Sequence, residues 1–411
     1  MAPGNLAGAW IGGKAPAPRM ETAVAHRIIS LDGGGAWAVL EAMALGDIFG
    51  AATPGHQILR NFDLAVSNSG GSIVLGGLVE DMTPAQIVDL FNLPVNREAI
   101  FAKTGFVENL LSHIPIFPKY STLGKLAGLT AAFGAMGPRP LSSLTGDGWP
   151  QSNGADVKIL MVAFDYDSMR ARYFRSYSTP HGATADDVPM VQAVHASSDA
   201  PVIYFDAPTQ WGGRRYWDGA MAGLNNPLLA GLTDLLSDGV PANDICVLTL
   251  GTGTVKLAPP TIQPPAPAAL SQPWGASGVL PDLEKASGCI ADDPPDMASF
   301  STHVVLSAAR GTDPTQVGPV VRLSPIVRPV LTNGAWSVPE GLTADQFSAL
   351  ATLGMDAVEQ DQMDLITTLG DAWIADRSPN QPIRMNSDDL SSSLGEELYS
   401  AAKARWKTLC P

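Results

Sequence analysis

The sequence predicts an α/β fold with helices on both faces of a central, mostly parallel sheet. Short apolar runs that end in glycine turns alternate with segments whose apolar residues recur at helical spacing. Strands that alternate with helices in this way are typical of parallel sheets covered on both sides. The hydrophobic fraction of 45% and the charged fraction of 16% suit a sizeable core. We therefore expect a three-layer α/β/α domain followed by a C-terminal helical extension.

The pattern begins with two strand–helix units. His26–Leu31 is an apolar run rich in isoleucine that stops at a glycine turn, as a buried strand does. The elements expected in this part are a strand at His26–Leu31, a helix at Ala36–Phe49, a strand at Phe62–Val66, a helix at Ile73–Val79, and a helix over Ile87–Phe91 that Thr83-Pro84 opens.

The middle of the chain is irregular at first and then resumes the alternation. Residues 104–150 mix apolar side chains with proline and glycine, and they fit either a mobile cap over a site or an ordinary insertion. The elements expected after them are strands at Val157–Phe164 and Arg172–Ser176, a helix at Val188–Ala196, a strand at Arg214–Trp217, a helix at Pro227–Leu236 and a strand at Ile245–Leu250.

The last third predicts a proline-rich excursion and then helices. Residues 258–283 contain repeated prolines and are typical of a surface loop. Helices are expected at Thr343–Leu353 and Met355–Leu369, and a capping box at Ser393–Glu396 predicts a final helix to Leu409. The domain organisation predicted from these features is a loose tail at 1–25, one large domain at 26–335 and the helical extension at 336–411.

Charge and composition exclude several classes of function. The formal net charge of −15 repels nucleic acid, so no nucleic-acid partner is expected, and any membrane contact should be transient, apolar and local. The N-terminus lacks the pattern of a secretory signal, and no apolar run approaches the ~20 residues of a membrane span. We expect a soluble, cytoplasmic protein. The three cysteines and six histidines form no disulfide framework or metal motif, so no metal or other cofactor is predicted.

Ser69 is the first candidate for chemistry. It lies between an expected strand and an expected helix in the string Ser67-Asn-Ser69-Gly-Gly71, where small residues occupy the positions two before and two after it. A tight turn of this kind lifts a serine hydroxyl above the sheet, and the neighbours must be small for the backbones to pass. The following helix directs the positive end of its dipole toward the serine. Serine–glycine clusters are also common as simple caps and turns.

A glycine loop and an aspartate complete the candidate set. Asp32 is followed by Gly33, Gly34 and Gly35, whose amides are able to approach a negatively charged oxygen without a side chain in the way. No complete nucleotide-binding glycine motif is present. Asp218 ends an expected strand, and a carboxylate there is able to accept a proton from a serine hydroxyl if a dry pocket or a close hydrogen bond raises its basicity.

As an ordered set, these motifs resemble the patatin-like phospholipases. The shared pattern is a D-G-G-G loop, a G-x-S-x-G serine and a D-G-[GA] aspartate with N-N-P downstream. The matching strings are DGGG at Asp32–Gly35, FDLAVSNSGGS at Phe62–Ser72, ASSDAPVIYF at Ala196–Phe205, DGAMAGLNNP at Asp218–Pro227 and LTLGTG at Leu248–Gly253. The resemblance implies a lipid acyl hydrolase with Ser69 as nucleophile, Asp218 as its base, no catalytic histidine, and an oxyanion hole at Gly33, Gly34 and Gly35. It also implies a lipid or another acyl ester as substrate.

The sequence departs from the family pattern at two places. The basic residue and glycine that usually follow the loop are replaced by Trp37 and Ala38, which puts the bracing of the loop in doubt. Ser67 stands where the serine turn usually has its first glycine, and because serine is small we expect the turn to survive.

Three other interpretations stay open at this point. The order Ser69, Asp218, His303 fits a Ser–His–Asp hydrolase, although Ser301–Leu306 looks like the interior of a strand, and His195 looks like a packed polar residue. The same residues also suit an acyltransferase or a thioesterase. A site that holds a lipid without turnover, in an effector or binding module, is the third. Acyl chain length, headgroup and oligomeric state are not predicted.

Overall fold

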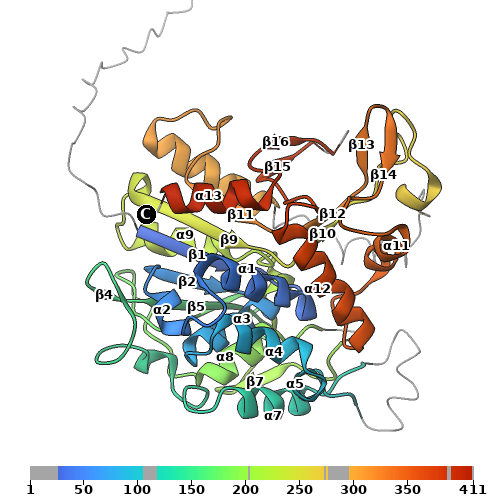
Figure 1. Cartoon of the computed structure of the whole chain (residues 1–411). Helices are drawn as coiled ribbons and strands as arrows, with labels where there is room; N and C mark the ends of the chain where they lie inside the picture. The colour runs from blue at the N-terminus through green and yellow to red at the C-terminus, as the bar shows by residue number, and fades with distance from the viewer. Residues whose placement is uncertain are drawn as a thin grey trace, which may run out of the picture.

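The main sheet of the computed structural model has eight strands, five of them parallel (Figure 1). The structure describes residues 26–104, 118–201, 204–272, 275, 296–386 and 390–409. In spatial order the strands are β11 (Val320–Leu323), β9 (Ile245–Leu250), β1 (His26–Leu31), β2 (Leu64–Ser67), β5 (Lys158–Asp165), β8 (Arg214–Asp218) and β7 (Thr209–Trp211), with β6 (Arg170–Arg175) also paired to β5. The run from β11 to β5 is parallel, and β6, β7 and β8 are antiparallel to their neighbours.

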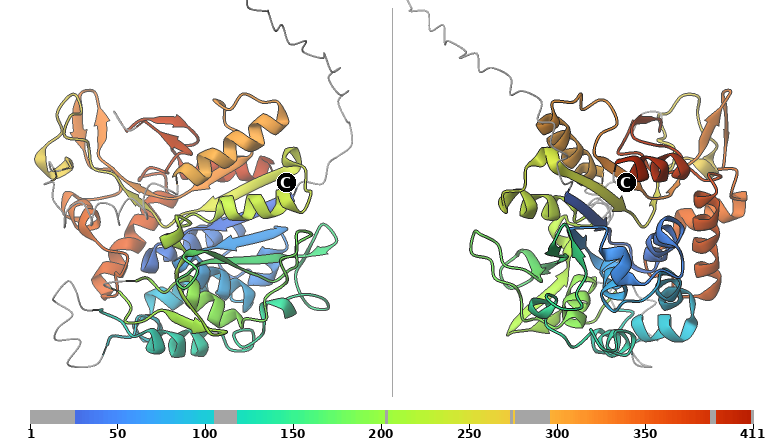
Figure 2. Two further views of the ribbon diagram at one scale, coloured as in Figure 1. Left: turned by 180° about the vertical axis from the view of Figure 1, so that it is seen from behind. Right: turned by 60° about the vertical axis from the view of Figure 1, so that its left-hand side comes forward.

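Alternating side chains of the strands build a core on each face of the sheet. In β2, Leu64 and Val66 join one buried cluster and Ala65 joins the other, as the two-residue period of a strand requires. One cluster is covered by α1 (Val39–Phe49), α3 (Ser69–Val79) and α8 (Met190–Ser197), and the other by α9 (Leu228–Ser237) and the helical residues 296–310. The opposite views of Figures 1 and 2 show α1 and α9 on different sides of the sheet. The expected three-layer α/β/α fold is confirmed.

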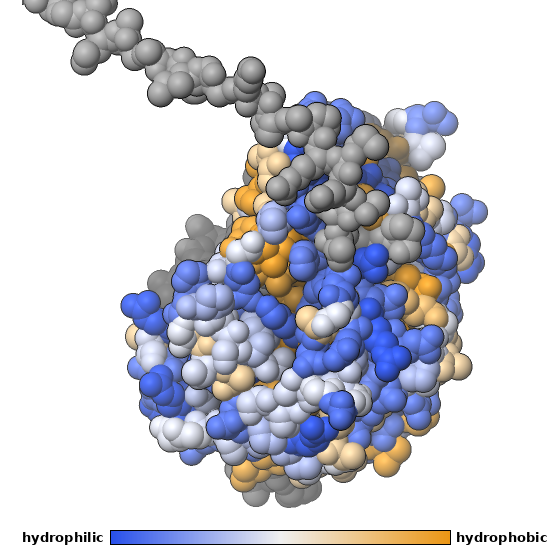
Figure 3. All heavy atoms as spheres, turned by 90° about the vertical axis from the view of Figure 1, so that its left-hand side faces the viewer, coloured by the Kyte–Doolittle hydropathy of each residue, from blue (hydrophilic) through white to orange (hydrophobic). Residues whose placement is uncertain are grey.

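One face of the molecule is largely polar. Figure 3 shows one face on which hydrophilic residues predominate, with smaller apolar groups between them. Within the part of the chain that the structure describes, no helix combines the length and the apolar character needed to cross a bilayer.

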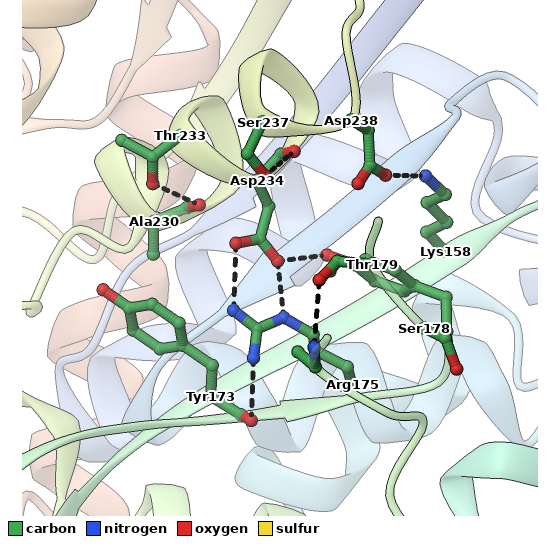
Figure 4. A network of polar contacts seen from close by, with 12 residues as sticks. Lys158, Tyr173, Arg175, Ser178, Thr179, Ala230, Thr233, Asp234, Ser237 and Asp238 are labelled. Carbon is green, nitrogen blue, oxygen red and sulfur yellow. Dashed lines mark hydrogen bonds and ion pairs between the residues drawn. The ribbon is translucent and has the colours of Figure 1, made fainter. Parts of the chain in front are cut away.

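Helix α9 is fastened to the sheet by a polar network (Figure 4). The Asp234 carboxylate accepts two hydrogen bonds from Arg175, at 2.6 and 2.9 Å, and one from the Tyr177 hydroxyl at 2.8 Å. Lys158 of β5 forms an ion pair with Asp238 at the end of the same helix. A bidentate arginine–carboxylate pair fixes direction as well as distance, so these contacts set how α9 lies across β5 and β6.

The C-terminal helices pack on the same core as the sheet. Trp406 of α13 (Tyr399–Leu409) stacks on Phe62 with 5.7 Å between ring centroids, and the Tyr399 hydroxyl donates to Asp47 at 2.7 Å. Buried residues of α12 (Gln360–Ile374) join the cluster that holds α1 and α3. The boundary at 335/336 stays a prediction, and the residues on its two sides share one hydrophobic core.

Smaller elements complete the described part of the chain. They are η1 (Gly35–Ala38), α2 (Gly55–Leu59), α4 (Pro84–Asn92), α5 (Pro94–Ile100), α7 (Thr122–Ala132), η2 (Leu141–Ser143), β3 (Gln151–Ser152), β4 (Ala155–Asp156), η3 (Gly219–Ala222), η4 (Ala242–Asp244), β10 (Thr254–Val255), η5 (Ala268–Leu270), β12 (Ile326–Val327), β13 (Val330–Thr332), β14 (Ala335–Ser337), α11 (Ala344–Thr352), β15 (Arg384–Met385) and β16 (Ser392–Leu394). The predicted tail at 1–25 and parts of the predicted cap and proline-rich loop lie outside the described residues.

Three local expectations were wrong. Residues 301–306, expected as a strand, belong to the helical stretch 296–310, because a short apolar run fits a buried helix as well as a strand. The helix expected from Met355 begins at Gln360, where Glu359 and Gln362 form the capping box. The Ser393 region is strand β16, and the last helix begins at Tyr399.

Candidate active site

Ser69 lies at a sharp turn between β2 and α3. It has φ of +50°, a left-handed conformation that is uncommon for a residue with a side chain. The turn needs the glycines that follow: a Cβ at Gly70 would lie 2.5 Å from the Gly35 carbonyl oxygen, and one at Gly71 would lie 2.6 Å from that of Asp32. A strained serine at a strand-to-helix turn is the geometry of a nucleophile elbow.

Hydrogen bonds that involve several serine side chains stabilise the turn at Ser69. The Ser69 amide donates to the Ser197 hydroxyl at 3.1 Å, and Ser72 links Ser197 to Ser67 through hydroxyl contacts of 2.8 and 2.9 Å. All four serines are buried. Ser67, in place of the usual glycine, therefore contributes a contact to the turn. Ser197 ends α8 and lies in the string Ala196–Phe205, but its contact with Ser69 depends on tertiary structure and was not predicted.

Asp218 reaches Ser69 because two strands meet end to end. Strand β6 occupies one edge of β5 over residues 160–165, so β2 and β8 share the other edge. Ser67 pairs with Met161 in parallel, and Asp218 pairs with Ala163 in antiparallel orientation. The carboxyl ends of β2 and β8 therefore face each other. Asp218 was expected at the end of a parallel strand, and this was wrong, because an apolar pattern carries no strand direction.

The Asp218 carboxylate is buried and receives hydrogen bonds from several donors. The Ala220 amide donates to it at 2.8 Å and the Asn68 side-chain amide at 3.0 Å, and the Ser69 hydroxyl lies close enough to lower its pKa. Burial raises the pKa of Asp218 above its ordinary value, and these hydrogen bonds act in the opposite direction. The net effect is a carboxylate that is more basic than an exposed aspartate. Asn68 was not predicted, because its role depends on the meeting of two strands.

The glycine loop runs alongside the elbow. A Cβ at Gly33 would lie 2.9 Å from that of Ser69, so the loop backbone passes directly beside the nucleophile. The Gly33 amide donates to the Asn225 carbonyl at 2.8 Å, and it is therefore occupied in this conformation. The amides of Gly34 and Gly35 have no protein acceptor among the described residues. Of the three predicted oxyanion donors, these two are available.

Residues far along the chain brace the loop. The Trp37 indole donates to the Gly354 carbonyl at 3.0 Å, the Ala36 amide donates to Met355 at 2.9 Å, and the Thr252 hydroxyl donates to the Gly33 carbonyl at 2.7 Å. Trp37 thus anchors the loop to the segment between α11 and α12. These contacts stabilise the glycine loop although the usual basic residue is absent.

Asp32, at the start of the loop, takes part in a buried group of charges. Its carboxylate pairs with Arg322 of β11 at 2.6 Å, and its amide donates to Glu41 at 2.7 Å. Burial raises the pKa of Asp32 to about 6, against the charge and hydrogen bond of Arg322. Burial and the nearby Asp32 hold the pKa of Glu41 well above its usual range.

The two histidines considered from the sequence have other partners. His303 is buried, and its Nε2 lies 3.0 Å from the Pro314 carbonyl oxygen and 3.4 Å from the Ser307 hydroxyl. His195 lies in α8, where burial and then the charge of Lys125 hold its pKa well below the ordinary value. Neither ring has a described contact with Ser69 or Asp218, so the geometry gives no support to a Ser–His–Asp triad.

Comparison with known proteins relates one segment of the chain to a protein family. The family model described as patatin-like phospholipase matches residues 29–232, a segment that contains the glycine loop, Ser69 and Asp218. Among solved structures, the chain is similar to the crystal structure of VipD from Legionella pneumophila, with 12% identity and a TM-score of 0.33 over 85% of this chain and 67% of that chain. A search of curated proteins found no significant match. Residues 29–232 therefore carry a patatin-like phospholipase domain.

Proposed function

We propose that this protein is a serine acyl hydrolase that cleaves carboxylic ester bonds of lipids through a dyad of Ser69 and Asp218. The observation that carries the proposal is the left-handed Ser69 at a strand-to-helix turn, next to Asn68, whose side chain donates to the buried Asp218 carboxylate. A serine hydroxyl becomes a useful nucleophile when an adjacent base accepts its proton. The site has that base, and the amides of Gly34 and Gly35 lie in the loop beside the nucleophile.

The reaction divides into two halves. In the first, Ser69 Oγ attacks the carbonyl carbon of the ester while its proton passes to Asp218. The amides of Gly34 and Gly35 then hold the oxyanion, and the start of α3 places the positive end of a helix dipole beside it. Collapse of this intermediate breaks the ester bond, and the leaving alcohol takes the proton from Asp218. In the second half, water attacks the acyl-serine while its proton passes to Asp218, and collapse of the intermediate breaks the bond to Ser69 Oγ, which takes the proton from Asp218 as the acid leaves.

The first test is hydrolysis of chromogenic acyl esters, from short to long chains, by the wild type, Ser69→Ala and Asp218→Ala. Each variant should lose activity by about 10³-fold or more, because removal of one member of a nucleophile–base pair disables the pair. Ser400→Ala, at an exposed position in α13, is the matched control and should keep full activity.

A covalent fluorophosphonate probe gives a second readout of the same site. Labelling should occur at Ser69 in the wild type and be lost in Ser69→Ala. Equal ester turnover by the wild type and both dyad variants contradicts the proposal. A wild type that neither turns over esters nor labels at Ser69 favours the binding-module interpretation. Release of the acyl group to an added alcohol in preference to water would identify an acyltransferase.

A further inference from the structure

Lys125 is a buried cation close to the dyad. It lies on α7, which packs against α8, and only 1% of the residue is exposed. Its Nζ lies 3.6 Å from Asp199 Oδ1, 3.5 Å from the His195 carbonyl oxygen and 4.2 Å from the centre of the Phe205 ring. All three partners belong to the stretch from α8 to β7. A buried ammonium is costly unless it is paired, so this position requires an explanation.

Asp199 links this cation to both members of the dyad. Its side chain is fully buried and accepts a hydrogen bond from the Thr209 hydroxyl at 3.0 Å. Its main-chain carbonyl accepts the Asp218 amide at 3.0 Å. Two residues earlier, the Ser197 hydroxyl accepts the Ser69 amide. The segment that Lys125 holds therefore contacts the nucleophile on one side and the base on the other.

The charges around Asp218 do not balance without Lys125. The groups that face this carboxylate from α3 and η3 are neutral donors, namely Ser69, Asn68 and the Ala220 amide. His195 of α8 is uncharged at neutral pH because burial and then Lys125 lower its pKa. That leaves two buried carboxylates, Asp199 and Asp218, and one buried cation. The charge of Lys125 acts on Asp218 as well as on Asp199.

We propose that Lys125, held in place by Asp199, is a positioning residue that keeps Asp218 ionised and therefore able to act as the base for Ser69. This inference rests on the proposed function of the dyad. Burial raises the pKa of Asp199 to about 6 and lowers that of Lys125 to about 8. Both partners are thus charged in the range between, where the enzyme needs an ionised Asp218.

The test is the pH dependence of kcat/KM for a soluble short-chain ester, because its acidic limb reports the pKa of the free base. Lys125→Met should move that limb about one unit to higher pH, since an opposite charge has been lost. Asp199→Asn should move it to lower pH, since the full charge of Lys125 then acts on Asp218. Lys125→Arg keeps the charge and should restore the wild-type limb.

The opposite directions separate an electrostatic role from a structural one. Lys158→Met, which breaks an ion pair on the opposite face of the sheet, is the matched control and should leave the limb unchanged. Thermal unfolding of every variant identifies those that fail to fold. The inference is overturned if the acidic limbs of Lys125→Met and Asp199→Asn agree with that of the wild type to about 0.3 pH units. It is also overturned if both limbs move in the same direction.

A measurement without turnover distinguishes this inference from the proposed function. The carboxyl group of Asp218 can be titrated by NMR in protein carrying ¹³C-labelled aspartate, with its resonance assigned by its loss in Asp218→Asn. A higher titration midpoint in Lys125→Met and a lower one in Asp199→Asn support the inference even if the wild type hydrolyses no ester. Equal midpoints overturn it even if the dyad is fully active.

Discussion

Single side chains around Asp218 decide how basic this carboxylate is. Asn68 occupies the N-cap position of α3, yet its side chain makes no capping hydrogen bond to the helix. It donates instead to Asp218, at 3.0 Å. A hydrogen bond to the charged form of a carboxyl group lowers its pKa. Asn68 therefore acts with Lys125 to offset the effect of burial on the base.

Asn68→Ala should move the acidic limb of kcat/KM to higher pH by about 0.5 to 1 unit. The sign follows from the lost hydrogen bond: the pKa of Asp218 rises, so more of the base is protonated at a given acidic pH. The rate should fall most near the limb and recover at higher pH. Asn61→Ala is the control, because its side chain bonds main-chain carbonyls of α2. An unshifted limb in Asn68→Ala would count against this role.

At this scale, the sequence predicted the residues that belong to a motif and missed those that act through tertiary contacts. Ser69, Asp218 and the glycine loop stand beside turns with recognisable spacing, and the structure brings them together. Asn68 and Lys125 carry no local signal, because their partner Asp218 lies 150 and 93 positions away in the chain. The hydrogen bond of the Gly33 amide was also not predicted, because its acceptor, the Asn225 carbonyl, belongs to a distant segment of the chain.

At the scale of elements, the segment between α11 and α12 stabilises the glycine loop beside Ser69. Its backbone accepts hydrogen bonds from Trp37 and Ala36 next to the glycine loop. Asp356 in the same segment receives hydrogen bonds from Lys119 at 2.7 Å and from the Tyr120 hydroxyl at 3.1 Å. One short stretch thus ties the loop beside Ser69 to the start of α7.

Trp37→Phe should lower kcat several-fold and reduce the free energy of unfolding by about 1 kcal/mol. The smaller phenyl ring loses the hydrogen bond to Gly354 and part of the buried packing of the indole, so the loop loses part of its support. Steady-state kinetics and urea unfolding check both effects. Trp211→Phe, at a partly exposed position on β7, is the matched control and should change neither. Wild-type kcat in Trp37→Phe would show that the brace is dispensable.

The direction and length of elements were harder to predict than their existence. The parallel arrangement of β9, β1, β2 and β5 follows from the alternation of strands and helices, and the structure confirms it. Strand β11, at the edge of this parallel core, was not predicted. The antiparallel β8 does not follow from that pattern, because a tight hairpin turn at Gly212 and Gly213 joins it to β7 and reverses the direction of the chain. The apolar run at residues 301–306 is too short to distinguish a helix from a buried strand.

At the scale of the whole molecule, buried charges join the first strand–helix unit to the last strand of the sheet. Arg322 of β11 pairs with Asp32, and Asp32 in turn lies beside Glu41 of α1. Glu41 is fully buried, with one oxygen bonded to the Asp32 amide. Because its folded-state pKa lies well above the ordinary value, stability should depend on pH through this group.

Glu41→Gln should make the protein less sensitive to rising pH. A carboxyl whose pKa is raised by folding contributes its full stability below about pH 4, and this contribution is lost as pH rises through the folded-state pKa. The wild type should therefore lose stability relative to Glu41→Gln from pH 5 to 8, by at most about 1.4 kcal/mol per unit. Urea unfolding at several pH values checks this. Exposed Glu98→Gln should parallel the wild type.

The pairing of β1 with β9 has a consequence for synthesis on the ribosome. All six residues of β1 pair with β9, which lies about 220 residues later in the chain. At roughly 5–20 residues per second, β9 is translated on the order of 10 to 40 seconds after β1. Until then, the edge of β1 that pairs with β9 has no partner strand. An unpaired strand edge is a template for association with other chains. The edge of β1 that pairs with β9 is therefore open to association with other chains during this interval.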